Sequence, residues 1–219
     1  MKKYFMIIAC AFVALSASAQ RASSSSSSFF STEKSDAPIT FGITAGVNFA
    51  NMSFSADGGS YSPDSRTAFN VGLTVDFPIL ESLYIKSGLL YSSKGYKIED
   101  DDETYTASPA YLEIPILASY RYNFSDAAQL QFNVGPYVAY GIGGKYKYES
   151  DYYDEERETD FFDDDTNKFD LGLQFGLGLT ISQHFNIGVS YQLGLTNVFD
   201  EDGIDVKNRN LMINLGYTF

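Results

Sequence analysis

The sequence predicts an all-β fold, an eight-stranded antiparallel up-and-down barrel, and three observations support this prediction. Apolar residues alternate with small or polar residues in eight segments, and short turns between segments alternate with long polar connections. The 219 residues also include 18 Gly, 17 Tyr and 18 Phe, a composition that suits barrel strands. Because successive side chains of a strand point to opposite faces, each segment has one apolar and one small, polar face.

Residues 1–19 have the pattern of a secretory signal peptide. Lys2 and Lys3 precede an apolar run, and Ala17-Ser18-Ala19 is a typical cleavage site. Cleavage there removes Cys10, the single cysteine, so neither a disulfide nor thiol chemistry is expected in the mature chain. The alternative is that Cys10 ends a lipobox and the protein is a lipoprotein.

The next segment, residues 20–38, is predicted to be a flexible periplasmic tail. It contains six consecutive serines at 23–28, which cannot contribute to a core. A partner-binding segment centred on Phe29 and Phe30 is the alternative. The barrel itself is predicted to occupy residues 39–219.

The first four strands are predicted at residues 40–50, 69–77, 83–96 and 111–124. The apolar face of the first consists of Phe41, Ile43, Ala45, Val47 and Phe49. The second repeats the pattern with Phe69, Val71, Leu73, Val75 and Phe77, and the fourth with Leu112, Ile114, Ile116, Ala118, Tyr120 and Tyr122. In all of these strands the opposite face is rich in Gly, Asn, Ser and Thr, as expected when the two faces of a strand meet different environments.

The last four strands are predicted at residues 129–148, 169–181, 185–195 and 209–219. The sixth has Phe169, Leu171, Leu173, Phe175, Leu177, Leu179 and Ile181 on one face, and the seventh has Phe185, Ile187, Val189, Tyr191, Leu193 and Leu195. The final strand has Leu211, Ile213, Leu215, Tyr217 and Phe219.

The connections predict that the barrel is transmembrane. Tight turns are expected at 79–82, 125–128 and 182–184, and long acidic loops at 51–66, 97–110, 149–167 and 199–208. Short periplasmic turns and long outer loops are typical of bacterial outer-membrane barrels, whose even strand number puts both termini in the periplasm. A soluble lipocalin-like barrel with an internal ligand is the alternative, but its outer face would be dense in Lys, Glu and Arg.

Several motifs resemble the outer-membrane β-barrel family common in Bacteroidetes, the PorT-like group, with an architecture similar to OmpX and the OmpA barrel. They are Phe41-Gly-Ile-Thr-Ala-Gly-Val-Asn48, Tyr84-Ile-Lys-Ser-Gly-Leu-Leu-Tyr-Ser-Ser-Lys-Gly-Tyr96, Tyr111-Leu-Glu-Ile-Pro-Ile-Leu117, Phe132-Asn-Val-Gly-Pro-Tyr137 and the final strand. The aromatic end of the chain, with Tyr217 and Phe219, resembles the assembly signal of such barrels. The resemblance implies a location in the outer membrane, with lipid, lipopolysaccharide and the barrel assembly machinery as partners. It also implies an alternative function, as an accessory factor for secretion or transport.

Catalysis is not expected. The single histidine, His184, falls in a predicted periplasmic turn, and no serine lies in a G-x-S-x-G motif. Because the mature chain has a single histidine and no cysteine, the sequence predicts no metal site built from these ligands. The net charge of −13 gives no reason to expect a nucleic-acid partner, and a monomer is expected.

Charged residues on the small, polar face predict a buried ion network inside the barrel. They are Asp76, Lys86, Glu113, Arg121 and Asp170. Because the interior of an eight-stranded barrel is only wide enough for side chains, we expect this network to plug the lumen.

The long acidic loop at 149–167 is the predicted interaction site. Residues 149–165 hold ten carboxylates against Arg157 alone. The candidate contact residues are Tyr152, Tyr153, Phe161, Phe162, Asp163, Asp164 and Asp165. They suggest an extracellular protein ligand of positive charge, and the aspartates suggest Ca²⁺, although no EF-hand spacing is present. The alternatives are a solvated loop that binds nothing and aromatic side chains that pack on neighbouring loops.

Overall fold

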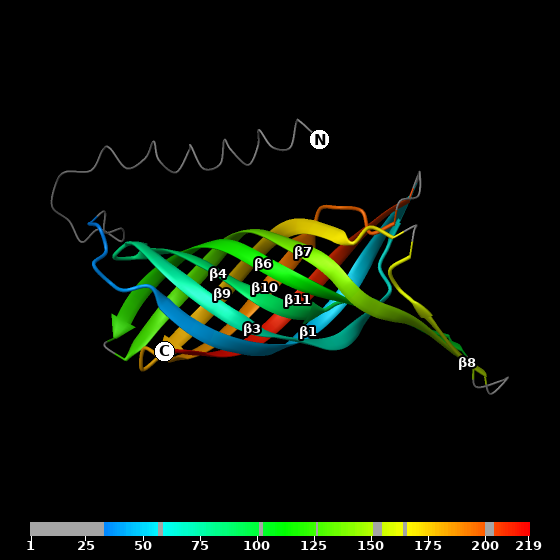
Figure 1. The fold of residues 1–219 in the computed structure, drawn as a ribbon, viewed down its shortest axis with the longest axis horizontal. Coiled ribbons are helices and arrows are strands. Elements are labelled where there is room, and N and C mark those ends of the chain that lie inside the picture. The colour runs from blue at the N-terminus through cyan, green and yellow to red at the C-terminus, as the bar shows by residue number, and fades with distance from the viewer. Residues whose placement is uncertain are drawn as a thin grey trace.

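The computed structural model describes residues 33–56, 59–100, 103–125, 127–150, 155–163, 166–199 and 204–219 as a single β-sheet (Figure 1). The predicted signal peptide and residues 20–32 of the predicted tail lie outside these residues. The strands are β1 (Thr40–Ala56), β2 (Gly59–Tyr61), β3 (Asp64–Leu80), β4 (Leu83–Ser93), β5 (Tyr96–Asp100), β6 (Glu103–Ser125), β7 (Ala128–Ser150), β8 (Glu155–Asp160), β9 (Phe169–Ile181), β10 (Phe185–Gly194) and β11 (Ile204–Thr218).

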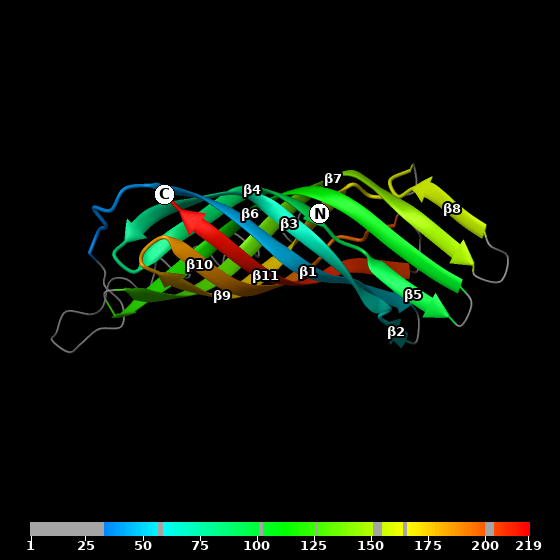
Figure 2. The same ribbon diagram turned by 90° about the horizontal axis from the view of Figure 1, so that it is seen from below.

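Eight of the described strands close into a ring. Each long strand pairs antiparallel with its neighbour in the order β1-β3-β4-β6-β7-β9-β10-β11, and β1 also pairs with β11. At the closure Val47 lies opposite both Phe69 and Ile213, so the apolar faces of three strands coincide. The predicted eight-stranded antiparallel up-and-down barrel is confirmed, and Figure 2 shows its wall from a second direction.

Both described ends of the barrel chain lie at the end that carries the tight turns. Strand β1 begins there and β11 ends there, beside the connections β3–β4, β6–β7 and β9–β10. In the last of these, Ser182 and Gln183 have φ of 51° and 64°, the left-handed region that two central residues of a type I′ hairpin adopt. Lys34, near the end of the predicted tail, forms an isolated bridge with Leu80 at the same end.

The barrel is apolar outside and polar inside. The exposed large hydrophobic side chains form an outer belt; on β1 and β3 they include Phe41, Ile43, Val47, Phe49, Phe69, Val71, Leu73 and Phe77. The buried set consists instead largely of Asn, Gln, Ser and charged residues. This inversion is expected when the outer face contacts lipid and the inner face is packed with side chains. No helix in the described residues is long and apolar enough to span a membrane.

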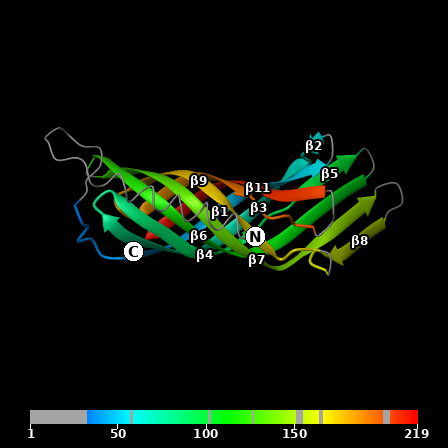
Figure 3. The same cartoon turned by 90° about the horizontal axis from the view of Figure 1, so that it is seen from above.

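At the end opposite the tight turns, the sheet extends beyond the predicted strands. Strand β6 begins at Glu103 rather than 111, β7 ends at Ser150, and β5 and β8 pair with β6 and β7. We call residues 96–100, 103–108, 145–150 and 155–160 the outer arm; Figure 3 shows it projecting from the barrel. Prediction of loops at 97–110 and 149–167 was wrong over these residues, because charged residues on both faces hide the two-residue period while the backbones still pair.

Candidate functional site

The lower part of the lumen, near the tight turns, contains a buried ion pair. Arg121 Nη2 lies 2.6 Å from Asp76 Oδ2, and the guanidinium stacks over the Tyr84 ring at 3.7 Å from its centre. Lys86 points into the same region and donates to Gln131 Oε1 at 3.5 Å. Adjacent strands β3, β4, β6 and β7 supply these side chains, all from the small, polar face.

The upper part of the lumen is centred on Lys94, whose side chain is 0% exposed. Its Nζ lies 3.0 Å from Glu113 Oε2 and 3.2 Å from Asp170 Oδ2. It also lies over the aromatic rings of Tyr137 and Tyr111, at 4.3 and 5.3 Å from their centres. We call these five residues the lysine cluster. Two carboxylates and two ring faces compensate for the desolvation of the ammonium.

Hydrogen bonds fix the carboxylates of the lysine cluster. Asp170 Oδ2 accepts from Tyr137 Oη at 3.2 Å and from Asn208 Nδ2 at 3.0 Å, while Oδ1 accepts from Thr196 Oγ1 at 3.1 Å. Glu113 Oε1 accepts from Gln192 Nε2. These donors come from three strands, β7, β10 and β11, and from the loop after β10, so the cluster joins opposite walls of the barrel and fills its cross-section.

The five residues predicted to form one lumen network therefore lie in two groups. Asp76, Lys86 and Arg121 are together in the lower part, whereas Glu113 and Asp170 are brought together in the upper part by a residue that the prediction missed. That residue, Lys94, lies an even number of residues after Lys86 in the third predicted strand, so its side chain falls on the same inward face. Extending the alternating pattern to the end of that strand would have identified it.

Above the lysine cluster, apolar side chains cover the lumen. Met52, Ala107, Phe161, Val198 and Val206 are all buried and pack together, and we call them the mouth cluster. Phe161 lies 4.7 Å from the Tyr146 ring centre and 5.0 Å from that of Phe162, which in turn packs on Tyr111.

The buried position of one predicted contact residue favours packing over partner contact for that residue. Phe161 is 0% exposed and packs on neighbouring segments, the alternative noted for these aromatics. Thr166 Oγ1 donates to Asp163 Oδ1 at 3.0 Å, a hydrogen bond near the end of the loop. Tyr152, Tyr153, Asp164 and Asp165 lie outside the described residues. Within the described part of the chain, no group of three or more His, Cys, Asp or Glu is arranged to hold a metal ion.

The outer arm has an excess of negative charge. Its residues include eight carboxylates and four cations. Lys145 pairs with Glu158, and its hydrogen bond lowers the pKa of the Glu158 carboxyl. Lys147 lies between Glu149 and Glu156, at 2.6 and 2.8 Å, and the hydrogen bonds to them raise the pKa of its ammonium. These ion pairs are solvent-exposed, so each contributes little to the stability of the arm. Their main effect is to orient side chains across β7 and β8.

At the opposite end, His184 and the end of the chain pack together. The His184 ring stacks on Tyr217 at 5.4 Å, and Nδ1 lies 2.7 Å from the Thr218 carbonyl oxygen. Phe219 is 69% exposed on the outer face, and its backbone N–H donates to the Phe41 carbonyl. The histidine is thus part of the turn structure, and Phe219 is accessible to lipid or to another protein.

Comparison with known proteins gives one family. Residues 19–200 match the model of the outer membrane protein beta-barrel domain. A search of curated proteins finds no significant match.

Three similar solved structures are each remote in sequence from this chain. Ail, the attachment invasion locus protein of Yersinia pestis, is 17% identical, with 86% of this chain and 100% of that chain covered and a TM-score of 0.40. OprG from Pseudomonas aeruginosa is 14% identical, with 85% and 97% covered and a TM-score of 0.44. Neisserial surface protein A is 10% identical, with 84% and 100% covered and a TM-score of 0.42.

Proposed function

We propose that this chain, which belongs to the outer membrane protein beta-barrel domain family, is a non-enzymatic surface-interaction protein whose outer arm binds a cationic extracellular partner. The barrel is an outer-membrane protein, and its belt of exposed apolar side chains contacts lipid and lipopolysaccharide. The part of the molecule that carries the function is then the outer arm, which extends beyond the membrane.

The observation that carries the proposal is the outer arm itself. Residues 103–110 of β6 continue beyond the belt, and eight residues of strand span about 25 Å. The arm is held as a sheet of β5, β6, β7 and β8 rather than as independent loops. A preformed acidic sheet steers a cationic partner toward the surface and loses little conformational entropy when the partner binds.

An internal role is less well supported. The lumen is occupied by the lysine cluster and covered by the mouth cluster, so solute passage has no open route among the described residues. An accessory role in secretion, which the resemblance to the PorT-like group implies, is favoured by no observation of the structure, and we do not propose it.

The test is removal of β8, which carries four of the eight carboxylates of the outer arm, with the mouth cluster left in place. Residues 151–160 are replaced by a short Gly/Ser linker, so that Phe161 and Phe162 are retained, and the protein is placed in lipid nanodiscs. A lysine-rich peptide serves as the probe, and we expect its affinity to fall at least tenfold and its salt dependence to weaken. A matched pair of single charge changes is Glu156→Gln on β8 and Glu81→Gln at the tight-turn end, each of which removes one carboxylate.

Unchanged affinity in the linker variant, with normal folding shown by its gel mobility, would remove β8 from consideration as the binding element. Equal losses in Glu156→Gln and Glu81→Gln would show that net charge alone is responsible. In either case the proposed function fails, because it requires the position of the charges as well as their sign.

A further inference from the structure

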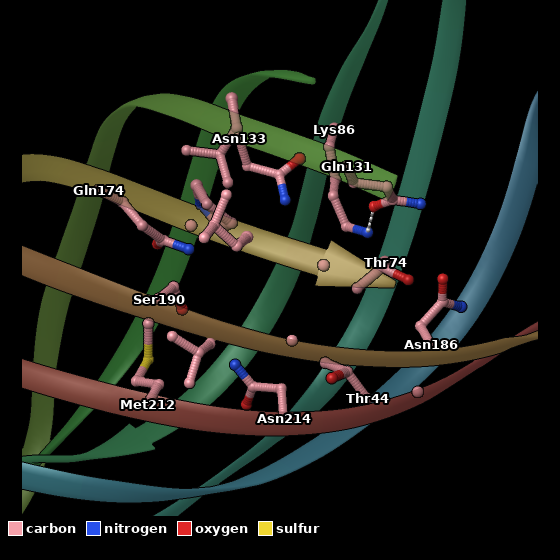
Figure 4. Close-up of a pocket in the computed structure, with 18 of the residues that line it drawn as sticks. Thr44, Thr74, Lys86, Gln131, Asn133, Gln174, Asn186, Ser190, Met212 and Asn214 are labelled. Carbon is pink, nitrogen blue, oxygen red and sulfur yellow. Dashed lines mark hydrogen bonds between the residues drawn. The ribbon is translucent and has the colours of Figure 1, made fainter. Parts of the chain in front are cut away.

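An extracellular partner meets the outer arm before it meets the barrel interior. Inside the barrel a cavity of about 110 Å³ lies among residues of all eight barrel strands, and Figure 4 shows side chains that line it. The lysine cluster borders this cavity through Glu113, and the mouth cluster lies above both. The surface that a partner reaches first is therefore on the arm, whose two faces differ in chemistry.

One face of the outer arm carries all of its lysines, and we call it the charged face. The strand register and the two-residue period place eight charged residues on it: Lys97, Glu99, Lys145, Lys147, Glu149, Glu156, Glu158 and Asp160. Each lysine pairs with at least one glutamate, and Lys147 pairs with two. The carboxylates of the charged face are thus largely compensated by lysines of the arm itself.

The other face is aromatic, and we call it the tyrosine face. Its outer row consists of Ile98, Tyr105 and Tyr148, which lie opposite one another on β5, β6 and β7. In the next row toward the barrel, Tyr96 and Tyr146 pack against the mouth cluster. The tyrosine face therefore continues the apolar packing of the mouth, but its outer row is accessible, since Tyr105 is 44% exposed.

Glu103 adds a fixed carboxylate to the tyrosine face. The hydroxyls of Tyr105 and Tyr148 donate to its two oxygens, at 3.1 and 2.9 Å. The two tyrosine rings lie 4.8 Å apart between their centres, with 40° between their planes. Among the described arm residues no lysine lies on this face, and its cation, Arg157, is at the β8 edge opposite Tyr148. Because each carboxylate oxygen has more than one lone pair, Glu103 can accept further hydrogen bonds.

An aromatic ring beside a carboxylate fits a guanidinium better than an ammonium. A guanidinium is planar, stacks on aromatic rings and donates two parallel N–H bonds to a carboxylate, whereas an ammonium is a compact, strongly hydrated point charge. The barrel itself contains this combination, because the Arg121 guanidinium lies over the Tyr84 ring at 3.7 Å and pairs with Asp76. On the tyrosine face, Tyr105 and Glu103 offer the same two groups to a partner.

We propose that the tyrosine face binds an arginine side chain of the extracellular partner, stacked on Tyr105 and paired with Glu103. This inference rests on the proposed function and names the residue type that the outer arm selects. The negative field of the arm attracts any cationic peptide, and the tyrosine face makes an arginine-bearing peptide bind more tightly than a lysine-bearing one.

The test compares two peptides of equal charge, nona-arginine and nona-lysine, on the full barrel in lipid nanodiscs. Tyr105→Leu should weaken nona-arginine binding by about two- to fivefold, the size of an exposed cation–π contact, and leave nona-lysine binding nearly unchanged. Tyr105→Phe removes the same hydroxyl but keeps the ring, and should bind nona-arginine like the wild-type protein. The matched control is Tyr61→Leu, which removes an exposed tyrosine of β2, outside the arm, and should alter neither affinity.

The nona-lysine affinity also reports whether the arm is intact in each variant. Unchanged nona-arginine binding in Tyr105→Leu, or an equal loss for both peptides, overturns the inference and leaves the proposed function standing. Failure of both peptides to bind the wild-type protein would overturn the proposed function and this inference with it. If Tyr105→Leu does not fold, Glu103→Gln replaces it: this variant should weaken nona-arginine binding more than nona-lysine binding, and equal losses would refute the arginine contact.

Discussion

At the scale of single residues, Lys94 connects two carboxylates and two aromatic rings in the upper lumen. It leaves strand β4 just before Gly95, whose φ of 119° turns the chain toward β5, and its backbone N–H donates to the Pro109 carbonyl. The side chain then lies between two carboxylates that would otherwise repel each other. Removing its charge leaves both of them buried without a cation.

We expect Lys94→Met to lower the free energy of unfolding by about 3–5 kcal/mol, because Glu113 and Asp170 lose their partner while the volume is nearly kept. Urea unfolding in lipid bilayers measures the change. Lys97→Met removes an exposed lysine of the same kind and should cost about 1 kcal/mol or less. Equal losses in the two variants would show that the lysine cluster does not stabilise the barrel.

In the turn between β9 and β10, by contrast, a substitution is expected to stabilise the barrel. Gln183 has a φ of 64°, which costs a residue with a Cβ more than it costs glycine. Gln183→Gly should stabilise the barrel by about 0.5–1 kcal/mol in the same assay. Gln129→Gly, placed in the regular strand β7, should destabilise it instead, and a gain in both variants would refute the explanation by left-handed geometry.

At the scale of elements, the acidic loop combines two parts with different tasks. The arm strand β8 is exposed and charged, whereas Phe161, which follows it directly, is buried in the mouth cluster. A replacement of the whole loop therefore changes barrel stability as well as the surface.

Phe161→Ala should lower the free energy of unfolding by about 3–5 kcal/mol, as is usual for a buried phenylalanine. The matched control is Tyr61→Ala on β2, where the ring is 61% exposed and the expected change is about 0.5 kcal/mol or less. Urea unfolding of both variants compares them directly. If Phe161→Ala behaves like Tyr61→Ala, the mouth cluster is not a core, and the loop can be treated as one mobile binding segment.

The sequence predicted the strands that cross the membrane and missed the strands that lie outside it. Phe41 to Phe49 and Leu211 to Phe219 alternate strictly because one face must be apolar in lipid. Strand β8 is exposed and charged, and β5 also carries charged side chains such as Lys97 and Glu99, so neither strand shows the long alternation of apolar and polar residues that the barrel strands have. The pairing of Lys94 with Asp170 depends on the tilt and register of strands distant in sequence, which period-two counting does not supply.

At the scale of the whole molecule, the wall separates two environments and must close without an edge. Strand β11 completes it by pairing with both β1 and β10. Phe219 extends this last strand with an exposed ring beside Tyr217, at 5.6 Å between ring centres. That ring contributes little to the packed interior, so we expect its loss to affect assembly rather than stability.

Deletion of Phe219 should accordingly lower the yield of folded barrel in the outer membrane while leaving the urea midpoint of the assembled fraction nearly unchanged. Folded barrel is quantified as the band that migrates faster in unboiled than in boiled samples, because the closed hydrogen-bonded wall resists detergent. Wild-type yield in the deletion would remove Phe219 as an assembly signal, and a lowered midpoint would assign it a structural role instead.

The filled lumen leads to the last prediction, which concerns transport through the barrel. An ion that enters from the tight-turn end meets the Asp76–Arg121 pair, then the lysine cluster, and finally the apolar mouth cluster. The lysine cluster joins opposite walls of the barrel, and the mouth cluster above it offers no polar partner to a hydrated ion. The wild-type protein in planar bilayers should show no large, stable conductance step, whereas a sixteen-stranded porin in the same bilayers should show one. Phe161→Ala alone should remain closed, because the lysine cluster still lies below it. The double variant Phe161→Ala with Lys94→Met should give brief, small openings. Large steady steps in the wild-type protein would mean that these side chains do not fill the barrel in the membrane.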